Sequence, residues 1–286
     1  MSVPACVEEA LGARVSSARR VSGGMISEAW ALELDGGPRV FVKARADANP
    51  GEFPAEAAAL RWLAEPGALR VPEVLACDEG FLALEWIEPG RLDAAGVEEL
   101  GRGLAGLHTA GAPACGAFPG GPERLPIGPL QMPNAPADAW PEFYAECRLR
   151  PLIAPAVDRG SLSSAGARAV ERVCERIDDL AGPPEPPARL HGDLWGGNVL
   201  AGADGRPWLI DPAAHGGHRE VDLAMLRLFG APPPRAFAAY EEVAPLAAGH
   251  EDRVGLWQLF PLLVHAVLFG GGYGGSAEET ARRYGR

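Results

Sequence analysis

The chain has 286 residues, 47% of them hydrophobic and 22% charged, with a formal net charge of −12 at pH 7. This length predicts one large or two closely packed globular domains. The acidic balance argues against a nucleic-acid partner, because contact with phosphates requires a basic surface. The cysteines lack CxxC spacing and indicate a reducing compartment, so we expect a cytoplasmic protein: Cys6, Cys77, Cys115, Cys147 and Cys174.

Three strands are predicted in the first third of the chain. Apolar residues dominate 29–34 and 39–44, and the intervening Asp35-Gly36-Gly37 is typical of a hairpin turn, since glycine tolerates positive φ. Residues 81–87 form a third apolar block, which Glu88-Pro89-Gly90 ends. The pattern therefore predicts a β-rich N-terminal region.

One helix is predicted between the second and third strands, and it offers a carboxylate partner for Lys43. Residues 52–63 are rich in Ala, Glu and Leu and predict a helix with Pro54 near its start. Lys43 lies inside an apolar strand, where its ammonium group needs a partner or a route to solvent. It either faces solvent from a half-exposed strand or pairs with a carboxylate. Glu56 is the preferred partner, and Glu52, one turn earlier, is the competitor.

Helices dominate the rest of the chain. Apolar residues recur at helical spacing over 97–107 and again over 170–180. Ser163 or Ser164 is a suitable N-cap for the second helix. The apolar run 256–269 is too short and too interrupted to span a bilayer, so we expect a buried helix there and no membrane partner.

These elements together predict an α+β fold with two lobes. The N-terminal lobe, residues 1–88, is expected to be β-rich, and the C-terminal lobe, residues 89–286, is expected to be mainly helical. Ligands commonly bind in a cleft between two such lobes. Residues with catalytic chemistry should therefore lie where the lobes meet.

The strongest chemical signal is the segment His191-Gly192-Asp193-Leu194-Trp195-Gly196-Gly197-Asn198. An Asp followed five positions later by an Asn is the spacing of the kinase catalytic loop. A fixed carboxylate at Asp193 would orient an acceptor hydroxyl and accept its proton, and the amide oxygen of Asn198 suits Mg²⁺. The alternative is that His191 and Asp193 only hold a turn by hydrogen bonds.

A second metal-type residue follows at the distance expected for a kinase. Asp211 comes after a short apolar strand, 208–210, thirteen positions beyond Asn198. Protein kinases have their second magnesium carboxylate in an Asp-Phe-Gly turn, and here the turn is Asp211-Pro212-Ala213. Asp211 taken alone could be a simple strand-end residue. Together with Asn198 it favours ATP and Mg²⁺ as cofactors.

Three parts of the N-terminal lobe are candidates for binding ATP. Lys43 and its carboxylate partner would contact the α- and β-phosphates. Residues 22–27, Ser-Gly-Gly-Met-Ile-Ser, either cover phosphates with backbone N–H groups or form a hairpin turn. Glu85 and Ile87, near the lobe boundary, are placed like an inter-lobe hinge whose backbone groups could pair with adenine. The candidate nucleotide contacts are Gly23, Gly24, Ser27, Lys43, Glu56, Glu85 and Ile87.

The chain resembles the fructosamine (ketosamine-3) kinases, a family within the protein-kinase-like fold that aminoglycoside and choline kinases share. The resemblance covers nearly the whole chain, and Trp195 in the catalytic loop is its most distinctive residue. Other segments that are similar to the family are Ser27-Glu28-Ala29, 53–60, 140–144, Arg148-Leu149, 217–225, 256–263 and 269–273.

The resemblance implies ATP-dependent phosphorylation of the C3 hydroxyl of a ketosamine, an adduct of a sugar with an amine. The product is less stable and decomposes, so the activity would be a deglycation. Asp222 would support the catalytic loop through its backbone, and Trp195 would line the acceptor site or pack the loop. His218 and Arg219 would face the acceptor or support the Asp211 loop. The acceptor would be a small molecule or a glycated protein.

Some positions depart from the family or lie outside its site. Met25 stands where some members have Cys, so redox control is not expected, and 120–127 is rewritten around Pro and Gly, which leaves acceptor preference open. His108, at the end of an apolar helix, is expected to be packed rather than catalytic.

An aminoglycoside- or choline-type kinase and, more remotely, an inactive nucleotide-binding module are the alternative functions. The sequence gives no indication of oligomeric state.

Overall fold

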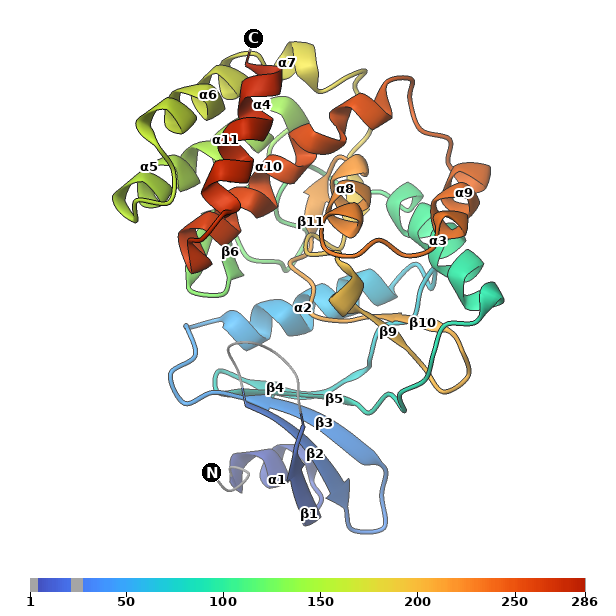
Figure 1. Ribbon diagram of the computed structural model, residues 1–286. Helices are drawn as coiled ribbons and strands as arrows, with labels where there is room; N and C mark the ends of the chain where they lie inside the picture. The colour runs from blue at the N-terminus through green and yellow to red at the C-terminus, as the bar shows by residue number, and fades with distance from the viewer. Residues whose placement is uncertain (1–4, 22–27, 286) are drawn as a thin grey trace.

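The computed structural model describes residues 5–21 and 28–285, and it contains a smaller sheet-rich part and a larger helical part (Figure 1). Five antiparallel strands form one sheet in the order β1-β2-β3-β5-β4. Helix α2 lies between this sheet and the helical part, and α1 lies on the opposite face of the sheet (Figure 1). The elements are α1 (Ala5–Leu11), β1 (Val15–Arg20), β2 (Glu28–Leu34), β3 (Arg39–Ala44), α2 (Glu52–Ala64), β4 (Val74–Asp78) and β5 (Phe81–Glu85).

The alternation of side chains along β3 determines where Lys43 points. Successive side chains of a strand face opposite sides of the sheet. Val42 and Ala44 pack with Val7 of α1 on one side. Lys43 therefore points to the other side, where its register partner Leu82 belongs to the core that α2 covers.

The turns and helix starts of this part follow the sequence pattern. Gly36, in the predicted hairpin turn, has φ of 66°, and Gly51, which precedes α2, has φ of 78°. Both values favour glycine, because a Cβ clashes with the backbone in this region. Pro54 lies in the first turn of α2, where its missing N–H costs no helical hydrogen bond.

The larger part of the chain also contains three two-stranded ribbons, of which β9 and β10 lie beside α2 (Figure 1). Its helices are α3 (Ala94–Thr109), α4 (Trp140–Tyr144), a π-helix η1 (Ala145–Leu149), α5 (Arg150–Asp158), α6 (Ser164–Glu175), α7 (Ile177–Leu180), a 3₁₀ turn η2 (Gly196–Asn198), α8 (Glu220–Leu228), α9 (Pro234–Val243), α10 (His250–Phe269) and α11 (Tyr273–Tyr284). Its ribbons are β6 (Arg124–Ile127) with β7 (Leu130–Pro133), β8 (Ala188–Leu190) with β11 (His215–Gly217), and β9 (Val199–Ala201) with β10 (Pro207–Leu209).

Several element boundaries differ from the sequence prediction. The stripe over 170–180 forms two helices, because Arg176 leaves helical geometry at φ −111° and ψ 9°. The predicted 81–87 strand ends at Glu85, and the strand before Asp211 ends one residue early, at Leu209. The strand β6 was not predicted, since Pro126 removes one of its N–H donors.

Helix α10 is buried in the core of the helical part, as predicted for 256–269. Pro261 lies inside it, so the carbonyl of Trp257 lacks its usual N–H partner. The hydroxyl of Tyr144 lies 3.2 Å from that carbonyl and 2.9 Å from the carbonyl of Leu256, which replaces the lost hydrogen bond. Within 5–21 and 28–285, no helix is both long and apolar enough to cross a membrane.

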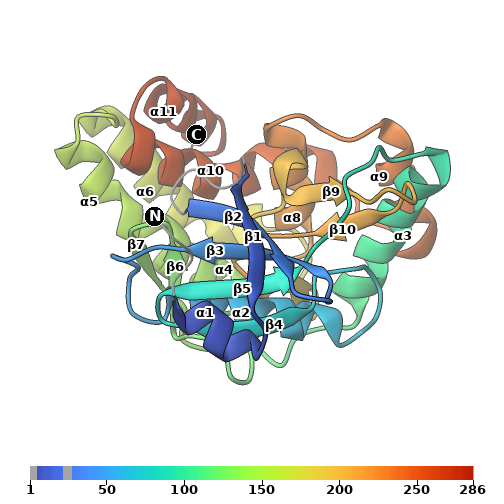
Figure 2. The same ribbon diagram turned by 90° about the horizontal axis from the view of Figure 1, so that it is seen from below.

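Helix α2 packs against the sheet and the helical part at once. Phe53 and Leu60 belong to the core beneath the sheet. Trp62 belongs instead to a core that includes α3, and its ring stacks on Phe118 with centroids 4.3 Å apart. The guanidinium of Arg189 also lies over a ring of Trp62, 4.4 Å from the ring centroid. Seen through the sheet, α2 lies behind β5 and in front of the helical part (Figure 2).

Candidate functional site

Lys43 connects the sheet, α2 and the Asp211 turn. Its Nζ lies 2.7 Å from Oε1 of Glu56 and 2.5 Å from Oδ1 of Asp211. Burial alone would lower the pKa of Lys43, but the two carboxylates raise it above its usual value, so the ammonium group stays charged. Glu52, the competing partner, pairs with Arg45 at 2.5 Å. The predicted ion pair between Lys43 and Glu56 is present.

The loop between β8 and β9 brings Asp193 beside Asn198. The Nδ2 of Asn198 donates to the backbone carbonyl of Asp193 at 2.8 Å and to its carboxylate Oδ2 at 3.1 Å. The amide oxygen of Asn198 is thus the atom that can bind a cation. Burial raises the pKa of the Asp193 carboxyl to about 6, against the opposing effect of the Asn198 hydrogen bond, and the Asp211 carboxylate adds to the rise.

Gly192 allows the catalytic loop to approach the Asp211 turn closely. Its φ is 82°, and a Cβ at this position would lie 2.0 Å from the carbonyl oxygen of Ala213. Only glycine satisfies both constraints. The Nε2 of His191 lies 2.9 Å from the carbonyl of Ile210 and links the same two segments. Asp193 and Asp211 therefore lie on adjoining, fixed turns.

Asp222 is fully buried and supports the catalytic loop, as predicted. Its carboxylate accepts hydrogen bonds from the backbone N–H groups of His191 at 2.7 Å and Gly192 at 2.9 Å. The Nε2 of His108 lies 3.2 Å from this carboxylate, and its Nδ1 lies 2.8 Å from the hydroxyl of Tyr240. His108 is packed, as expected, but it also orients Asp222. Sequence analysis missed this role because both partners are more than one hundred positions away.

Asp211 has a strained backbone. Its φ is 55°, and it is the one non-glycine residue with positive φ within the described parts of the chain. This conformation costs roughly 1–2 kcal/mol, and such strain is concentrated at functional sites. Lys43 binds its carboxylate, and the Nδ2 of Asn198 lies 3.5 Å from its carbonyl. These contacts keep the Asp211 carboxylate pointing toward Lys43.

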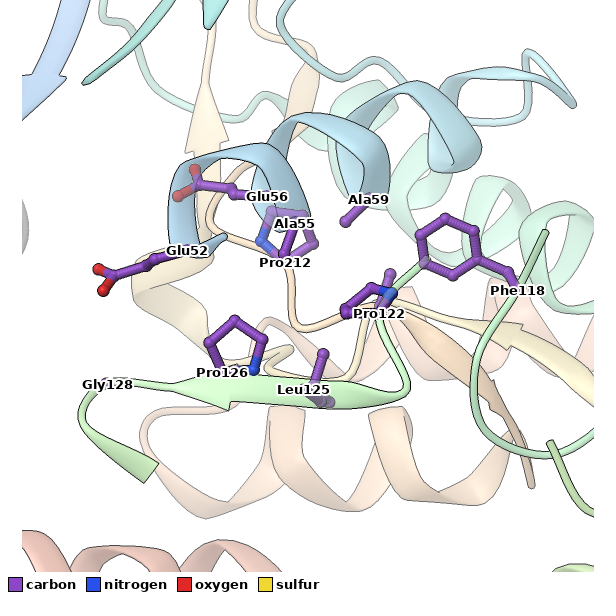
Figure 3. Close-up of a pocket in the computed structure, with 11 residues that line it drawn as sticks. Glu52, Ala55, Glu56, Ala59, Phe118, Pro122, Leu125, Pro126, Gly128 and Pro212 are labelled. Atoms are coloured by element: carbon purple, nitrogen blue, oxygen red, sulfur yellow. The ribbon is translucent and has the colours of Figure 1, made fainter. Parts of the chain in front are cut away.

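A cavity of about 120 Å³ is lined in part by Glu56, the helix partner of Lys43 (Figure 3). It lies between α2, Pro212 and the β6 strand, and Glu56 forms part of its wall (Figure 3). The Pro- and Gly-rich segment 120–127 contributes Pro122, Leu125 and Pro126 to this cavity. The structure thus places that segment against α2 and the Asp211 turn.

The other predicted nucleotide contacts are only partly described. The N–H of Glu85 donates to the carbonyl of Glu73 at 2.9 Å. Ile87 follows β5 and is half-buried. The candidates in the glycine-rich segment lie outside the described residues: Gly23, Gly24 and Ser27.

His218 and Arg219 both have partners in the helical part. The guanidinium of Arg219 binds the carboxylate of Glu185 through two contacts of 2.7 and 2.8 Å. The ring of His218 stacks on Trp257 with centroids 5.3 Å apart, and burial lowers its pKa. Both residues therefore fix the segment that leads into α8. Their roles at the acceptor or in support of the Asp211 loop stay predictions.

The fold and the site define a phosphotransferase of the protein-kinase-like class: a strand lysine paired with a helix glutamate, and an Asp–Asn loop beside a second Asp turn. The family model described as fructosamine kinase matches residues 2–284. The chain belongs to the fructosamine kinase family.

Relatives and solved structures agree with this assignment. A protein from Synechocystis named a probable ketoamine kinase is 36% identical, covering 94% of this chain and 90% of its own. The chloroplastic protein-ribulosamine 3-kinase of Oryza sativa is 31% identical, covering 96% and 81%. A Thermobifida fusca crystal structure that carries the name of a fructosamine-3-kinase is 46% identical with a TM-score of 0.92, covering 99% and 98%. An aminoglycoside phosphotransferase, 18% identical with a TM-score of 0.63 and coverage of 99% and 98%, shares the fold.

Proposed function

We propose that this protein transfers the γ-phosphoryl group of ATP to the C3 hydroxyl of ketosamines. The observation that carries the proposal is the convergence of Asp193, Asn198 and Asp211 beside Lys43. Membership of the fructosamine kinase family supplies the acceptor class, and relatives are named as kinases of ketoamines and ribulosamines. The phosphorylated adduct is less stable than the ketosamine and decomposes, so the activity is a deglycation.

The nucleotide is assigned to the N-terminal lobe, residues 1–88, and the acceptor to the C-terminal lobe, residues 89–286. Glu56 holds the Lys43 ammonium group where it can contact the α- and β-phosphates. The backbone carbonyl of Glu85 and the backbone of Ile87 pair with adenine. Backbone N–H groups of the glycine-rich segment cover the phosphates, with Gly23, Gly24 and Ser27 as the candidates.

The donor set fits Mg²⁺. The carboxylate of Asp211 and the amide oxygen of Asn198 are hard oxygen donors on adjoining turns. Mg²⁺ in kinases is held by few protein ligands together with phosphates and waters, so a cage of protein side chains is not required. The ion supplies neutralisation of charge on the transferring phosphoryl group. Asn198 and Asp211 would hold it.

Asp193 orients the acceptor hydroxyl and accepts its proton. A carboxyl with a pKa of about 6 is a stronger base than an ordinary aspartate and is still ionised at pH 7. Trp195, two residues farther along the loop, is exposed on one side and offers a flat apolar wall for the sugar. The acceptor is a free metabolite or a glycated protein with its amine substituent directed outward.

We also place the protein in the cytoplasm. Four cysteines are free thiols in the structure: Cys77, Cys115, Cys147 and Cys174. Burial raises the pKa of the Cys115 thiol to about 11, so it remains protonated and unreactive at neutral pH. Unpaired, protonated thiols suit a reducing compartment.

An acceptor panel with ATP and Mg²⁺ tests the function. Small ribulosamines or erythrulosamines should exceed choline and aminoglycosides by at least about tenfold in kcat/KM, which corresponds to about 1.4 kcal/mol of transition-state discrimination. NMR of the product should place the phosphate on C3. Faster turnover of choline or an aminoglycoside than of every ketosamine would show that the acceptor class is wrong. No ATP turnover with any acceptor would favour an inactive nucleotide-binding module.

A further inference from the structure

Five aromatic side chains, which we call the aromatic cluster, meet beside the catalytic loop. They come from the loop itself, from the residue after α8, and from the corner between α10 and α11: Trp195, Phe229, His265, Phe269 and Tyr273. The ring centroids of Phe229 and His265 lie 4.7 Å apart, and those of His265 and Tyr273 lie 5.0 Å apart. Trp195 meets Phe229 edge to face at 6.4 Å, and Phe269 lies 5.4 Å from His265.

The aromatic cluster is open to solvent. Trp195 is 38% exposed and Phe269 is 45% exposed, and the other three side chains are half-buried. By contrast, the aromatic group around Trp140 and Trp257 in the same part of the fold is buried and serves as core. Apolar rings gathered at the surface beside a catalytic loop are typical of a ligand-binding site.

Trp195 connects the aromatic cluster to the reacting position. The backbone N–H of Trp195 donates to the backbone carbonyl of Asp193 at 3.2 Å, so the two residues share one tight turn. Its ring lies across Gly197, where a Cβ would come within 2.3 Å of the ring. One face of the ring therefore packs on the loop. A group bound beside the aromatic cluster lies next to the hydroxyl that Asp193 orients.

The ring faces of the aromatic cluster are suited to a cation. Elsewhere in the described part of the chain, an arginine lies over each of seven other aromatic rings, whereas the contacts of these five rings are with one another. The Nδ1 of His265 lies 2.8 Å from the carbonyl of Pro261, so Nδ1 carries the hydrogen. Burial lowers the pKa of His265, and a neutral ring does not repel a cation.

A ketosamine carries such a cation close to its reacting hydroxyl. The nitrogen is a secondary amine attached to C1, and alkyl amines of this kind are protonated at neutral pH. Only C1 and C2 separate the nitrogen from the C3 carbon. When the C3 hydroxyl lies at Asp193, the ammonium group reaches the neighbourhood of Trp195. A free sugar or an N-acylated sugar amine has no positive charge at this position.

We propose that the aromatic cluster binds the protonated amine of the acceptor by cation–π contacts and thereby selects ketosamines of alkyl amines over neutral sugars. This inference rests on the proposed ketosamine kinase function. It assigns acceptor recognition to Phe229, His265 and Tyr273, which lie outside the catalytic loop. Cation–π contacts at partly exposed sites correspond to roughly threefold to tenfold in affinity.

Two acceptors that differ only in charge test this inference. One is a ketosamine with a secondary amine, and the other is its N-acetyl derivative, which has the same C3 hydroxyl but a neutral nitrogen. In Phe229→Leu and Tyr273→Leu, KM for the amine should rise roughly threefold to tenfold, while KM for ATP and for the N-acetyl derivative should change less than about twofold. Phe229→Tyr should retain the wild-type KM.

Phe237→Leu is the matched control, because the ring of Phe237 packs on Arg227 and not on the aromatic cluster. This variant should leave both acceptors unchanged, and melting curves should show that all variants fold. Equal KM shifts for the charged and neutral acceptors would overturn the cation-binding role alone. Failure of the wild-type protein to phosphorylate either acceptor would overturn the proposed function and this inference together.

Discussion

The environment of Asp193 raises the proton affinity of the carboxyl group that we propose as the general base. Burial raises its pKa to about 6, although a hydrogen bond from Asn198 acts in the opposite direction. In the unfolded chain the pKa of an Asp is about 3.9. The folded protein therefore binds more protons than the unfolded chain between these values, and the stability that protonation gives is lost as pH rises through about 6. An ionised carboxylate at this position therefore lowers the stability of the folded protein at neutral pH.

The variant Asp193→Asn separates the effect of this carboxyl group on turnover from its effect on folding stability. Turnover should fall by roughly 10² or more, the usual contribution of a positioned general base, while ATP affinity should stay within a few-fold. Because the ionised carboxylate is removed, the melting temperature at pH 7.5 should rise by a few degrees, and the difference should shrink as pH falls toward about 4. In the wild type, kcat/KM should decline below about pH 6. A near wild-type rate in this variant would show that another residue is the base.

At the scale of one element, α2 carries two glutamates on the same face with different partners. Glu56 pairs with the buried Lys43, whereas Glu52 pairs with Arg45, the residue after the end of β3. The two residues are one turn apart, share the same chemistry and lie on the same helix. They form a natural matched pair for measuring what the ion pair with Lys43 contributes.

We expect Glu56→Gln to lower kcat/KM for ATP by roughly tenfold or more, because Lys43 loses the carboxylate that aligns it and turns toward Asp211. Glu52→Gln should stay within about threefold of wild type, since it leaves the Lys43 contacts intact. Steady-state kinetics with varied ATP measure both. Equal losses in the two variants would mean that the charge of α2, and not the Lys43 contact, is responsible.

Local sequence patterns predicted α2, the β2–β3 hairpin and the loop that holds Asp193 and Asn198. These features depend on residues that are close to one another in the chain. The choice between Glu52 and Glu56 required the packing of α2 on the sheet, which helical spacing leaves open. The contact of His108 with Asp222 and the approach of His265 to Phe229 join distant segments. No periodicity indicates such pairs, so they emerged only from the structure.

At the scale of the whole molecule, the two parts share a core. Trp62 of α2 is buried with α3 in the helical part and stacks on Phe118, while Phe53 on the same helix is buried beneath the sheet. Arg189 lies over Trp62 and its Nη1 donates to the Trp62 carbonyl. Neither part can lose its structure without exposing apolar surface of the other.

The protein should therefore unfold in a single calorimetric transition, with equal calorimetric and van't Hoff enthalpies. Trp62→Ala should lower the melting temperature by roughly 5–15 °C without splitting the transition, because it leaves a cavity in the shared core. The half-buried Trp86 is the control, and Trp86→Ala should have a much smaller effect. Two separate transitions in the wild type would contradict a shared core.

The proline after Asp211 has a consequence for how such an enzyme is governed. In protein kinases the Phe of Asp-Phe-Gly moves between packed positions and sets the active or inactive state. Pro212 has a fixed φ, is buried, and lines the small cavity beside α2. It follows Asp211, the one non-glycine residue with positive φ among the described residues. A proline here restricts the backbone and has no aromatic ring that could move between packed positions. We therefore expect no switch of the Asp-Phe-Gly kind at this turn, so that flux through the enzyme should follow the concentrations of ketosamine and ATP.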